Sequence, residues 1–562
     1  DGGIKARIIG LLKEHEEDAL FSKMLATIRT DAPVPYKLPE ELKLNGNVLP
    51  NVLTLFDELG FRTLKARVRT VLGGGVEPTK EEATEEETED VESLDQTKFQ
   101  EAQLMLWLLA SDYTNPSLDD ILAYTKKEKF DEAYVALVRT LSEEEGLLKV
   151  YDTIEKPLIP VLREAEAWGV LVDTEEMKRL SVKYKKELGE IERRIYKAAG
   201  HEFNISSPKQ LGDVLFDELG LVVKGQKKTT GGQRSTRESE LEKIRDLHPV
   251  IEDILEYRQV QKLLSTYVDS IPPLLDAGGR LHANFLQAGT TTGRMASQNP
   301  NLQNIPVRSD RGRAIRNAFI APKGFELVAL DYSQIELRIA AILSEDEKLM
   351  NIFKSGRDVH TEVASAVFGV EADKVDKEMR RRAKIINFGI LFGMGVNALK
   401  AQLGTSTAEA HQFLEDYLTT FTRLAEYLEE TRGYARKHGY TETLFGRRRE
   451  FSGIKSPLPY VRAQAERMAI NAPIQGTEAD VIKLAMVQVY EYLKQEGESD
   501  SAHLTLQVHD ELVYEIADSK VEELTEKIRT IMENALPADQ THGVPIIVEA
   551  KRGKNWGEMT AI

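Results

Sequence analysis

Hydrophobic residues lead up to an acidic residue in two short segments that lie far apart in the chain. An apolar run ends at Asp331, which predicts a buried strand that presents one carboxylate, before a helix that begins near Ile335. Residues 504–515 alternate apolar and polar side chains on both sides of His509 and Asp510, which predicts a β-hairpin with the acid at its turn. An acid at a strand end is held on a rigid element and suits a metal ligand. Taken alone, Asp331 is equally well interpreted as a helix N-cap.

Stretches with helical spacing of apolar residues surround these two segments. The predicted helices cover residues 3–27, 51–71, 102–109, 157–168, 176–199, 251–269 and 466–477. A further helix is predicted to begin at Pro208, with Ser207 as its N-cap. Short strands are predicted at residues 169–172 and 544–551. Asp173, which follows the first of these strands, is interpreted as the N-cap of the next helix.

The composition is that of a folded chain with several domains. Its 562 residues allow about two to four domains, and 41% hydrophobic residues are enough for real cores. No run of about 18 apolar residues occurs, so no membrane span is expected. The absence of cysteine excludes disulfides and zinc–cysteine sites. No secretory signal opens the chain. Because its first residue is Asp1 and not Met, we expect a fragment, a processed product or a trimmed chain.

The net charge of −18 at first argues against nucleic-acid binding, but it is unevenly distributed. Ten acidic residues and one lysine lie between Glu77 and Asp95, so this stretch carries half of the net charge. Glycines 73–75 precede it, and glycines followed by like charges predict an extended acidic linker over residues 73–97. Charge therefore has to be judged locally, at the patches that would meet phosphates.

A long insert rich in arginine and lysine separates the two acidic segments. Arg380, Lys384, Phe388 and Phe392 follow one another at intervals of four. On a helix each such step drifts by only about 40°, so the four side chains share one slowly turning face. Two cations followed by two rings suit a nucleoside triphosphate, with the cations on phosphates and a ring on sugar or base. A solvated basic face and core phenylalanines are the alternatives.

Three motifs in these segments resemble those of one enzyme family. Residues 331–338, Asp-Tyr-Ser-Gln-Ile-Glu-Leu-Arg, resemble motif A of the A-family DNA polymerases, the bacterial DNA polymerase I type. Residues 380–389, Arg-Arg-Arg-Ala-Lys-Ile-Ile-Asn-Phe-Gly, resemble motif B, and residues 508–511, Val-His-Asp-Glu, resemble motif C. The three motifs follow one another in the same order and at similar separations as in that family. The resemblance covers the chain from about residue 150 onward and, more loosely, the part before it, as in a large fragment of such an enzyme.

The resemblance implies an α+β, multidomain, right-hand polymerase with an antiparallel-sheet palm and helical fingers and thumb. It places a remnant of the segment after a 5′-nuclease domain at residues 1–30 and the polymerase at 151–562. The thumb would span about 176–280, the palm about 281–345 and 465–562, and the fingers about 346–464. Residues 31–150 would form a reduced 3′–5′ exonuclease-like domain. We expect it to be inactive, because no strand with Asp-x-Glu occurs there to hold two metal ions, and Glu101 lacks acidic partners.

The expected chemistry is attack of a primer 3′-oxygen on the α-phosphate of a nucleotide, assisted by two divalent ions about 3.5–4 Å apart. Mg²⁺, with Mn²⁺ as a substitute, suits carboxylate ligands and substrate phosphates. Asp331, Asp510 and the backbone carbonyl of Tyr332 are the expected metal ligands. Glu511 would orient a ligand or bind water, and Lys384 would donate a proton to pyrophosphate.

The resemblance also assigns residues to the two substrates. The expected nucleotide-binding residues are Gln334, Ile335, Glu336, His360, Arg380, Lys384, Phe388 and Phe392. The expected DNA-binding residues are Lys228, Arg294, Asn304, Arg467, Asn471, Gln475 and His509. Residues 443–449 end in three arginines and are interpreted as a basic patch near template phosphates.

One position departs from the family pattern. Phe392 stands where most members have a tyrosine whose hydroxyl pairs with the motif A glutamate, here Glu336. That glutamate would block a 2′-hydroxyl and so select deoxyribose. We therefore expect Glu336 to lose a partner, which puts sugar selection in more doubt than catalysis.

The predicted function is template-directed DNA synthesis without proofreading, in DNA replication and repair. Its partners would be primer-template DNA and deoxynucleoside triphosphates, and the protein would act as a cytoplasmic, nucleoid-associated monomer. The alternatives are a catalytically silent primer-template binding protein, a single-subunit RNA polymerase, and a polymerase with relaxed sugar choice or RNA-templated synthesis.

Overall fold

The computed structural model describes residues 52, 94–223, 225–229, 232–307 and 309–562. The chain divides into two compact units, residues 1–88 and 89–562, and nearly all described residues belong to the second. The helix predicted at 3–27, the one at 51–71 apart from Val52, and residues 73–93 of the acidic linker lie outside the described part. No helix of the described residues is both long and apolar enough to cross a membrane.

A five-stranded antiparallel sheet lies at the centre of the second unit. Its strands follow the order β12 (Thr560–Ala561), β11 (Val548–Gly553), β6 (Phe325–Tyr332), β10 (Glu511–Ala517) and β9 (Ala502–Val508). The predicted strand before Asp331 and the predicted hairpin are both confirmed. The strand predicted at 544–551 begins only at Val548, which pairs with Tyr332, the last residue of β6.

Both faces of this sheet are covered. Successive side chains of a strand point to opposite sides, and those on both sides of β6 are buried. Val328 and Leu330 of β6 enter one core, while Leu327 and Ala329 enter another. Helices α15 (Ile335–Ser344), α22 (Pro459–Gln495) and α23 (Val521–Glu533) supply the first core. All of β9 is buried, including the polar positions of its apolar–polar alternation. Its polar side chains are hydrogen-bonded instead; the Thr505 hydroxyl, for example, donates to the carbonyl of Val513.

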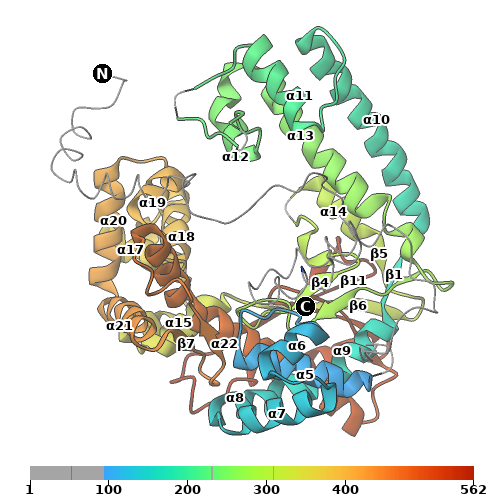
Figure 1. Cartoon of the computed structure of the whole chain (residues 1–562), viewed down its shortest axis with the longest axis vertical. Coiled ribbons are helices and arrows are strands. Elements are labelled where there is room, and N and C mark those ends of the chain that lie inside the picture. Colours follow the sequence, from blue (N-terminus) through green and yellow to red (C-terminus); the bar gives the residue numbers. More distant parts are fainter. Residues whose placement is uncertain (1–51, 53–93, 224, 230–231, 308) are drawn as a thin grey trace, which may run out of the picture. The chain divides into compact units, whose positions relative to one another are not determined.

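Helices α10 and α13 supply much of the second core and run side by side (Figure 1). Helix α10 spans Thr174–Ala199, and α13 spans Val250–Leu263 and continues as a π-helical turn through Leu264–Val268. Asp173 caps α10 as predicted, since its carboxylate accepts from the backbone N–H groups of residues 175 and 176 at 3.0 Å. Along the chain, α10 and α13 are separated by the short helices α11 (Pro208–Gly212) and α12 (Glu238–Leu241).

A run of helices is inserted between β6 and β9, after α15. Its members are α16 (Glu347–Lys354), α17 (Val359–Phe368), α18 (Lys377–Leu391), α19 (Val396–Leu403), α20 (Thr407–Thr420) and α21 (Thr422–His438). The hairpin β7 (Tyr440–Glu442) and β8 (Arg448–Glu450) leads from this insert to α22. The insert therefore joins the strand of one acid to the hairpin of the other.

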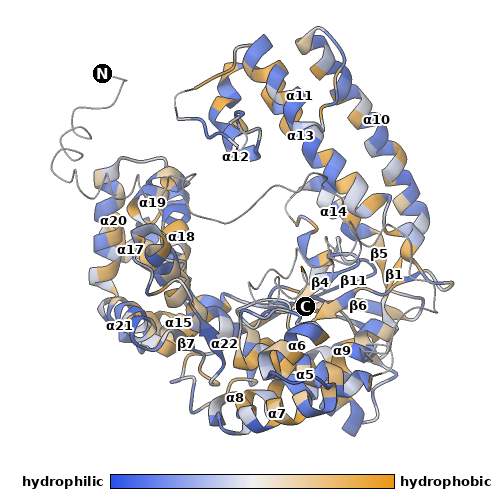
Figure 2. Ribbon diagram, in the orientation of Figure 1, coloured by the Kyte–Doolittle hydropathy of each residue, from blue (hydrophilic) through white to orange (hydrophobic). Residues whose placement is uncertain are grey.

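The described residues before 151 are helical and contain no strand. They form α5 (Gln96–Leu109), α6 (Leu118–Thr125), α7 (Phe130–Ser142) and α8 (Glu145–Val150). Hydrophobic residues dominate α5 in Figure 2, and residues 101–108 of this helix are almost all buried. Asp95 caps α5, so the acidic linker predicted to reach residue 97 was wrong at its end. The exonuclease-like origin of these helices stays a prediction.

The remaining elements join these parts. They are α9 (Lys156–Trp168), α14 (Asp310–Asn317), β1 (Val170–Val172), β2 (Arg280–Leu281), β3 (Asn284–Leu286), β4 (Ala296–Gln298) and β5 (Phe319–Ile320). Strands β2, β1 and β5 form a small antiparallel sheet, and β3 pairs with β4.

Candidate active site

The two predicted acids come together at one end of the central sheet. Asp331 of β6 lies opposite Glu511 of β10 on one side and opposite Glu549 of β11 on the other. Asp510 occupies the hairpin turn, and its carbonyl accepts a hydrogen bond from the backbone N–H of Tyr332 at 3.2 Å. Two carboxylates 179 positions apart thus become neighbours through strand pairing.

These acids carry more negative charge than their surroundings compensate. Burial, followed by the charges of Asp510 and Glu511, raises the pKa of Asp331 to about 7. Burial also raises the pKa of Asp510 and that of Glu511. The Oδ1 atom of Asp331 is buried and has no hydrogen-bond partner within the described chain. A bound cation would relieve both the repulsion and the unsatisfied oxygen.

The donor set fits a hard divalent ion that takes part of its ligands from elsewhere. In the described residues no group of three or more histidine or acidic side chains is arranged as a complete metal site. Mg²⁺ keeps several waters and binds substrate phosphates, so two carboxylates and a backbone oxygen are a sufficient protein share. The Tyr332 side chain is not available, because its hydroxyl is buried and donates to the carbonyl of Met532 at 2.9 Å.

Backbone strain marks both acidic segments. Gln334, which precedes α15, has φ = 56°, and His509 in the hairpin turn also has φ = 56°. Residues other than glycine rarely adopt this left-handed conformation, and they cluster at functional sites where the fold enforces it. Helix α15 begins at Ile335 as predicted, with Ile335 buried and Gln334 half-buried.

Glu511 is fixed more firmly than its sequence position suggested. The indole N–H of Trp556 donates to its Oε1 at 3.0 Å. The guanidinium of Arg316 lies 3.8 Å from the centre of the Trp556 ring. The sequence analysis gave Trp556 no role, because its contact with Glu511 spans 45 positions.

The predicted cationic and aromatic face of α18 is confirmed in part. Arg380 and Lys384 are exposed on α18, and the rings of Phe388 and Phe392 stack at 6.3 Å with 15° between their planes. The helix ends at Leu391, so the prediction that Phe392 continues it was wrong: Phe392 is the C-cap residue. Its ring is 40% exposed.

The two cations of this face differ in their partners. Arg380 donates to both carboxylate oxygens of Asp358 at 2.9 Å. Although burial acts in the opposite direction, the hydrogen bond from Arg380 helps to lower the pKa of Asp358 to about 2. Lys384 makes no ion pair within the described residues, so its ammonium is the freer of the two.

His360 lies inside the insert and not on this face. Only 3% of its surface is exposed, and its Nδ1 lies 3.0 Å from the amide nitrogen of Asn387 on α18. Burial lowers the pKa of His360 to about 4, so the imidazole is neutral at pH 7. This position suits support of α18 better than direct contact with a nucleotide.

Arg294 holds the motif A glutamate. Its Nη2 atom lies 2.7 Å from Glu336 and 2.5 Å from Glu478 of α22. Glu336, which was expected to lose the partner that a tyrosine at position 392 would provide, is thus held by an arginine. Glu478 was missed in the sequence, because its neighbours in the chain include other polar and charged residues such as Thr477 and Asp480 and nothing singles it out.

The other predicted DNA-binding residues occupy four places. Arg467, Asn471 and Gln475 lie on α22 as predicted; Arg467 is exposed, and Asn471 has a buried amide oxygen without a partner in the described chain. Lys228 is exposed in an isolated β-bridge with Arg234, Asn304 is exposed at the end of a 3₁₀ helix, and His509 is exposed at the hairpin turn. A cavity of about 180 Å³ lies between Arg294, His509 and α22.

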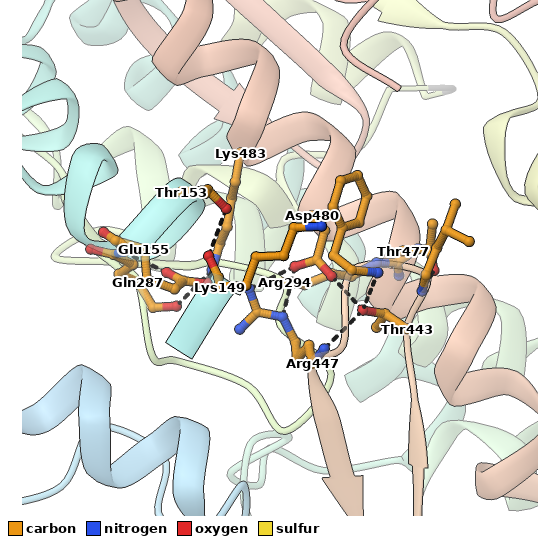
Figure 3. A network of polar contacts seen from close by, with 12 residues as sticks. Lys149, Thr153, Glu155, Gln287, Arg294, Thr443, Arg447, Thr477, Asp480 and Lys483 are labelled. Atoms are coloured by element: carbon orange, nitrogen blue, oxygen red, sulfur yellow. Dashed lines mark hydrogen bonds and ion pairs between the residues drawn. The ribbon is translucent and has the colours of Figure 1, made fainter. Parts of the chain in front are cut away.

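The expected basic patch at residues 447–449 was wrong for its first member. Arg447 is buried between Glu155 and Asp480, and Lys483 also pairs with Glu155 at 2.8 Å (Figure 3). Arg448 pairs with acids of α8's N-terminal turn and of β7. Two of the three consecutive arginines, Arg447 and Arg448, therefore form ion pairs within the protein.

Paired acids at the end of a central antiparallel sheet, with cations and rings on an inserted helix, define a nucleic-acid polymerase domain. Residues 174–558 match the model of DNA polymerase family A, and the chain belongs to this family. The α+β class and the polymerase fold predicted from the sequence are thereby confirmed.

Individual relatives agree. Over 415 residues the chain is 47% identical to the thermostable DNA polymerase I of Thermus filiformis, covering 74% of this chain and 49% of that protein. Over 409 residues it is 46% identical to DNA polymerase I of Deinococcus radiodurans, covering 73% and 42%. The chain spans about half the length of the curated relatives it matches. The polymerase domain of Pol1 from M. smegmatis, solved with a DNA primer-template and dNTP, is similar with a TM-score of 0.76 and 36% identity, covering 81% of each chain.

Proposed function

We propose that this protein is a DNA-directed DNA polymerase that extends a primer 3′ end with deoxynucleotides. The observation that carries the proposal is the pair Asp331 and Asp510, held side by side with a buried, unpartnered carboxylate oxygen. Together with the backbone carbonyl of Tyr332 they would hold two Mg²⁺ ions. When bound, such ions stabilise the attacking and leaving oxygens of phosphoryl transfer.

The residues of α18 would bind the nucleotide. Lys384 is free to meet its phosphates and to donate a proton to the leaving pyrophosphate. Arg380 would reach the phosphates by exchanging its bond to Asp358 for a more highly charged anion. The stacked rings of Phe388 and Phe392 offer an apolar face to sugar and base. Glu336, at the start of α15 with Gln334 and Ile335, would exclude a 2′-hydroxyl.

Primer-template DNA would be held by Lys228, Arg294, Asn304, Arg467, Asn471, Gln475 and His509. We further propose that residues 31–150 are a reduced exonuclease-like domain without proofreading, which acts as a scaffold for the polymerase. The similar Pol1 domain was solved with both substrates, which supports the choice of partners. The protein would act as a monomer with the bacterial nucleoid in the cytoplasm.

A silent primer-template binding protein is the second candidate, since exposed cations alone would bind DNA. Primer extension with Mg²⁺ separates the two. Asp510→Asn should abolish extension, whereas Asp539→Asn, an exposed aspartate without a partner in the described residues, should leave it unchanged. Retained DNA binding without extension by the unaltered protein would refute the polymerase proposal. Equal use of ribonucleotides would refute the role given to Glu336.

A further inference from the structure

One guanidinium nitrogen beside the candidate site joins two carboxylates from separate helices. Arg294 Nη2 lies 2.7 Å from Glu336 Oε1 on α15 and 2.5 Å from Glu478 Oε2 on α22. We propose that Glu478 is a positioning residue that determines sugar specificity, because it holds Arg294 where Arg294 fixes the Glu336 carboxylate. This inference rests on the proposed role of Glu336 in excluding a 2′-hydroxyl.

Hydrogen bonds hold the backbone around Arg294 in place, but they do not fix the position of its side chain. The Thr290 hydroxyl donates to the carbonyl of Arg294 at 2.7 Å, and the Thr290 carbonyl accepts from the indole of Trp107 at 2.9 Å. The Arg294 side chain, in contrast, is 34% exposed and borders the cavity of about 180 Å³. Without a second anchor it could turn into this cavity and leave Glu336.

Glu478 is well placed to be that anchor. Its side chain is only 3% exposed and projects from the buried middle of α22, so it has little freedom of its own. Burial raises the pKa of Glu478 to about 8, against the opposing effect of Arg294. A glutamine of the same shape keeps an acceptor oxygen for Arg294 and should therefore replace Glu478.

Glu336 depends on this arrangement because Phe392 offers it no hydroxyl. Phe392 stacks on Phe388 and has no polar side-chain atom. Within the described chain, the ion pair of Glu336 is with Arg294 alone. A carboxylate that must exclude one hydroxyl group needs a fixed position, since small displacements change which substrate fits.

The test compares kcat/KM for a deoxynucleotide with that for the matching ribonucleotide, with Mg²⁺ and a primed DNA template. Glu478→Ala should lower the preference for deoxyribose by about tenfold to a hundredfold, the effect of losing one charge-assisted hydrogen bond. Glu478→Gln should keep the preference within about threefold, because its carbonyl still accepts from Arg294. Glu466→Ala is the matched control. Glu466 also lies on α22 and also pairs with an arginine, but this arginine is Arg436 of α21.

The outcomes separate this inference from the proposed function. A lowered melting temperature of Glu478→Ala with unchanged sugar preference would mean a structural role only and would overturn the inference. If Glu478→Ala does not fold, Arg294→Lys removes the bridge from the other side, and an unchanged preference there would overturn it equally. Rescue of Glu478→Ala by Phe392→Tyr, which supplies the hydroxyl that most family members have at this position, would support it. Failure of the unaltered protein to extend any primer would instead refute the proposed function, and the inference with it.

Discussion

Arg447 is the residue whose loss should destabilise this protein most clearly. Its side chain is 4% exposed and donates to Asp480 Oδ1 from Nε at 2.7 Å and to Glu155, while its guanidinium lies 4.9 Å from the centre of the Trp107 ring. Arg447→Met keeps much of the volume and the ring contact but removes the charge. Among the described residues, Glu155 would keep its ion pair with Lys483, whereas Asp480, which is also fully buried, would lose its ion pair and keep the hydrogen bond from the Thr443 hydroxyl.

Leaving a buried carboxylate without its partner costs about 3–5 kcal/mol. The matched control is Arg448→Met, because the Arg448 side chain is 27% exposed and its pairs with Glu144 and Glu442 should contribute only about 1 kcal/mol or less. Urea unfolding followed by tryptophan fluorescence and circular dichroism would measure both changes. Equal losses in the two variants would show that the buried cluster is no more stabilising than surface pairs, and would refute this reasoning.

Two further predictions concern the metal ligands and the insert. Mg²⁺ should raise the melting temperature of the unaltered protein in proportion to its binding, but not that of Asp331→Asn, as differential scanning fluorimetry would show; an equal shift in both would mean that Asp331 is not a ligand. His360 has a pKa lowered to about 4 by burial, so the unfolded chain binds more protons between pH 4 and 6.5 and stability should fall as pH drops through that window. In His360→Gln the melting temperature should fall less steeply as the pH drops through this window. An unchanged fall would mean that other groups cause the pH dependence.

Local pattern was sufficient for the elements that carry the acids. The apolar run before Asp331 and the alternation around His509 and Asp510 are short-range signals, and the structure confirms the strand, the hairpin and the helix start at Ile335. The strand predicted from residue 544 starts late because its partner β6 ends at Tyr332, so the backbone before Val548 has no neighbour to pair with along β6. Pairing partners of this kind cannot be counted from one segment alone.

Long-range ion pairs explain most of what the sequence did not reveal about the site. Arg447 looked like a phosphate-binding cation because its partner Glu155 lies 292 positions earlier. Glu478 was overlooked because its bond to Arg294 spans 184 positions. Spacing along a helix reports which side chains share a face, but not which distant charge that face will meet.

The same buried cluster has a consequence for how this chain can change over evolutionary time. Trp107 of α5 covers the cations Arg447 and Lys483, and Glu155 binds both. The backbones of Gly146 in α8 and Gly446 approach so closely that a Cβ added to Gly446 would lie 3.1 Å from the Cα of Gly146. Helices α5 to α8 and the polymerase domain therefore share a packed interior and are not separate modules joined by a linker. A lineage could alter the outer surface of these helices freely. It could not delete or exchange them as a module without also rewriting the interior of the body that they seal.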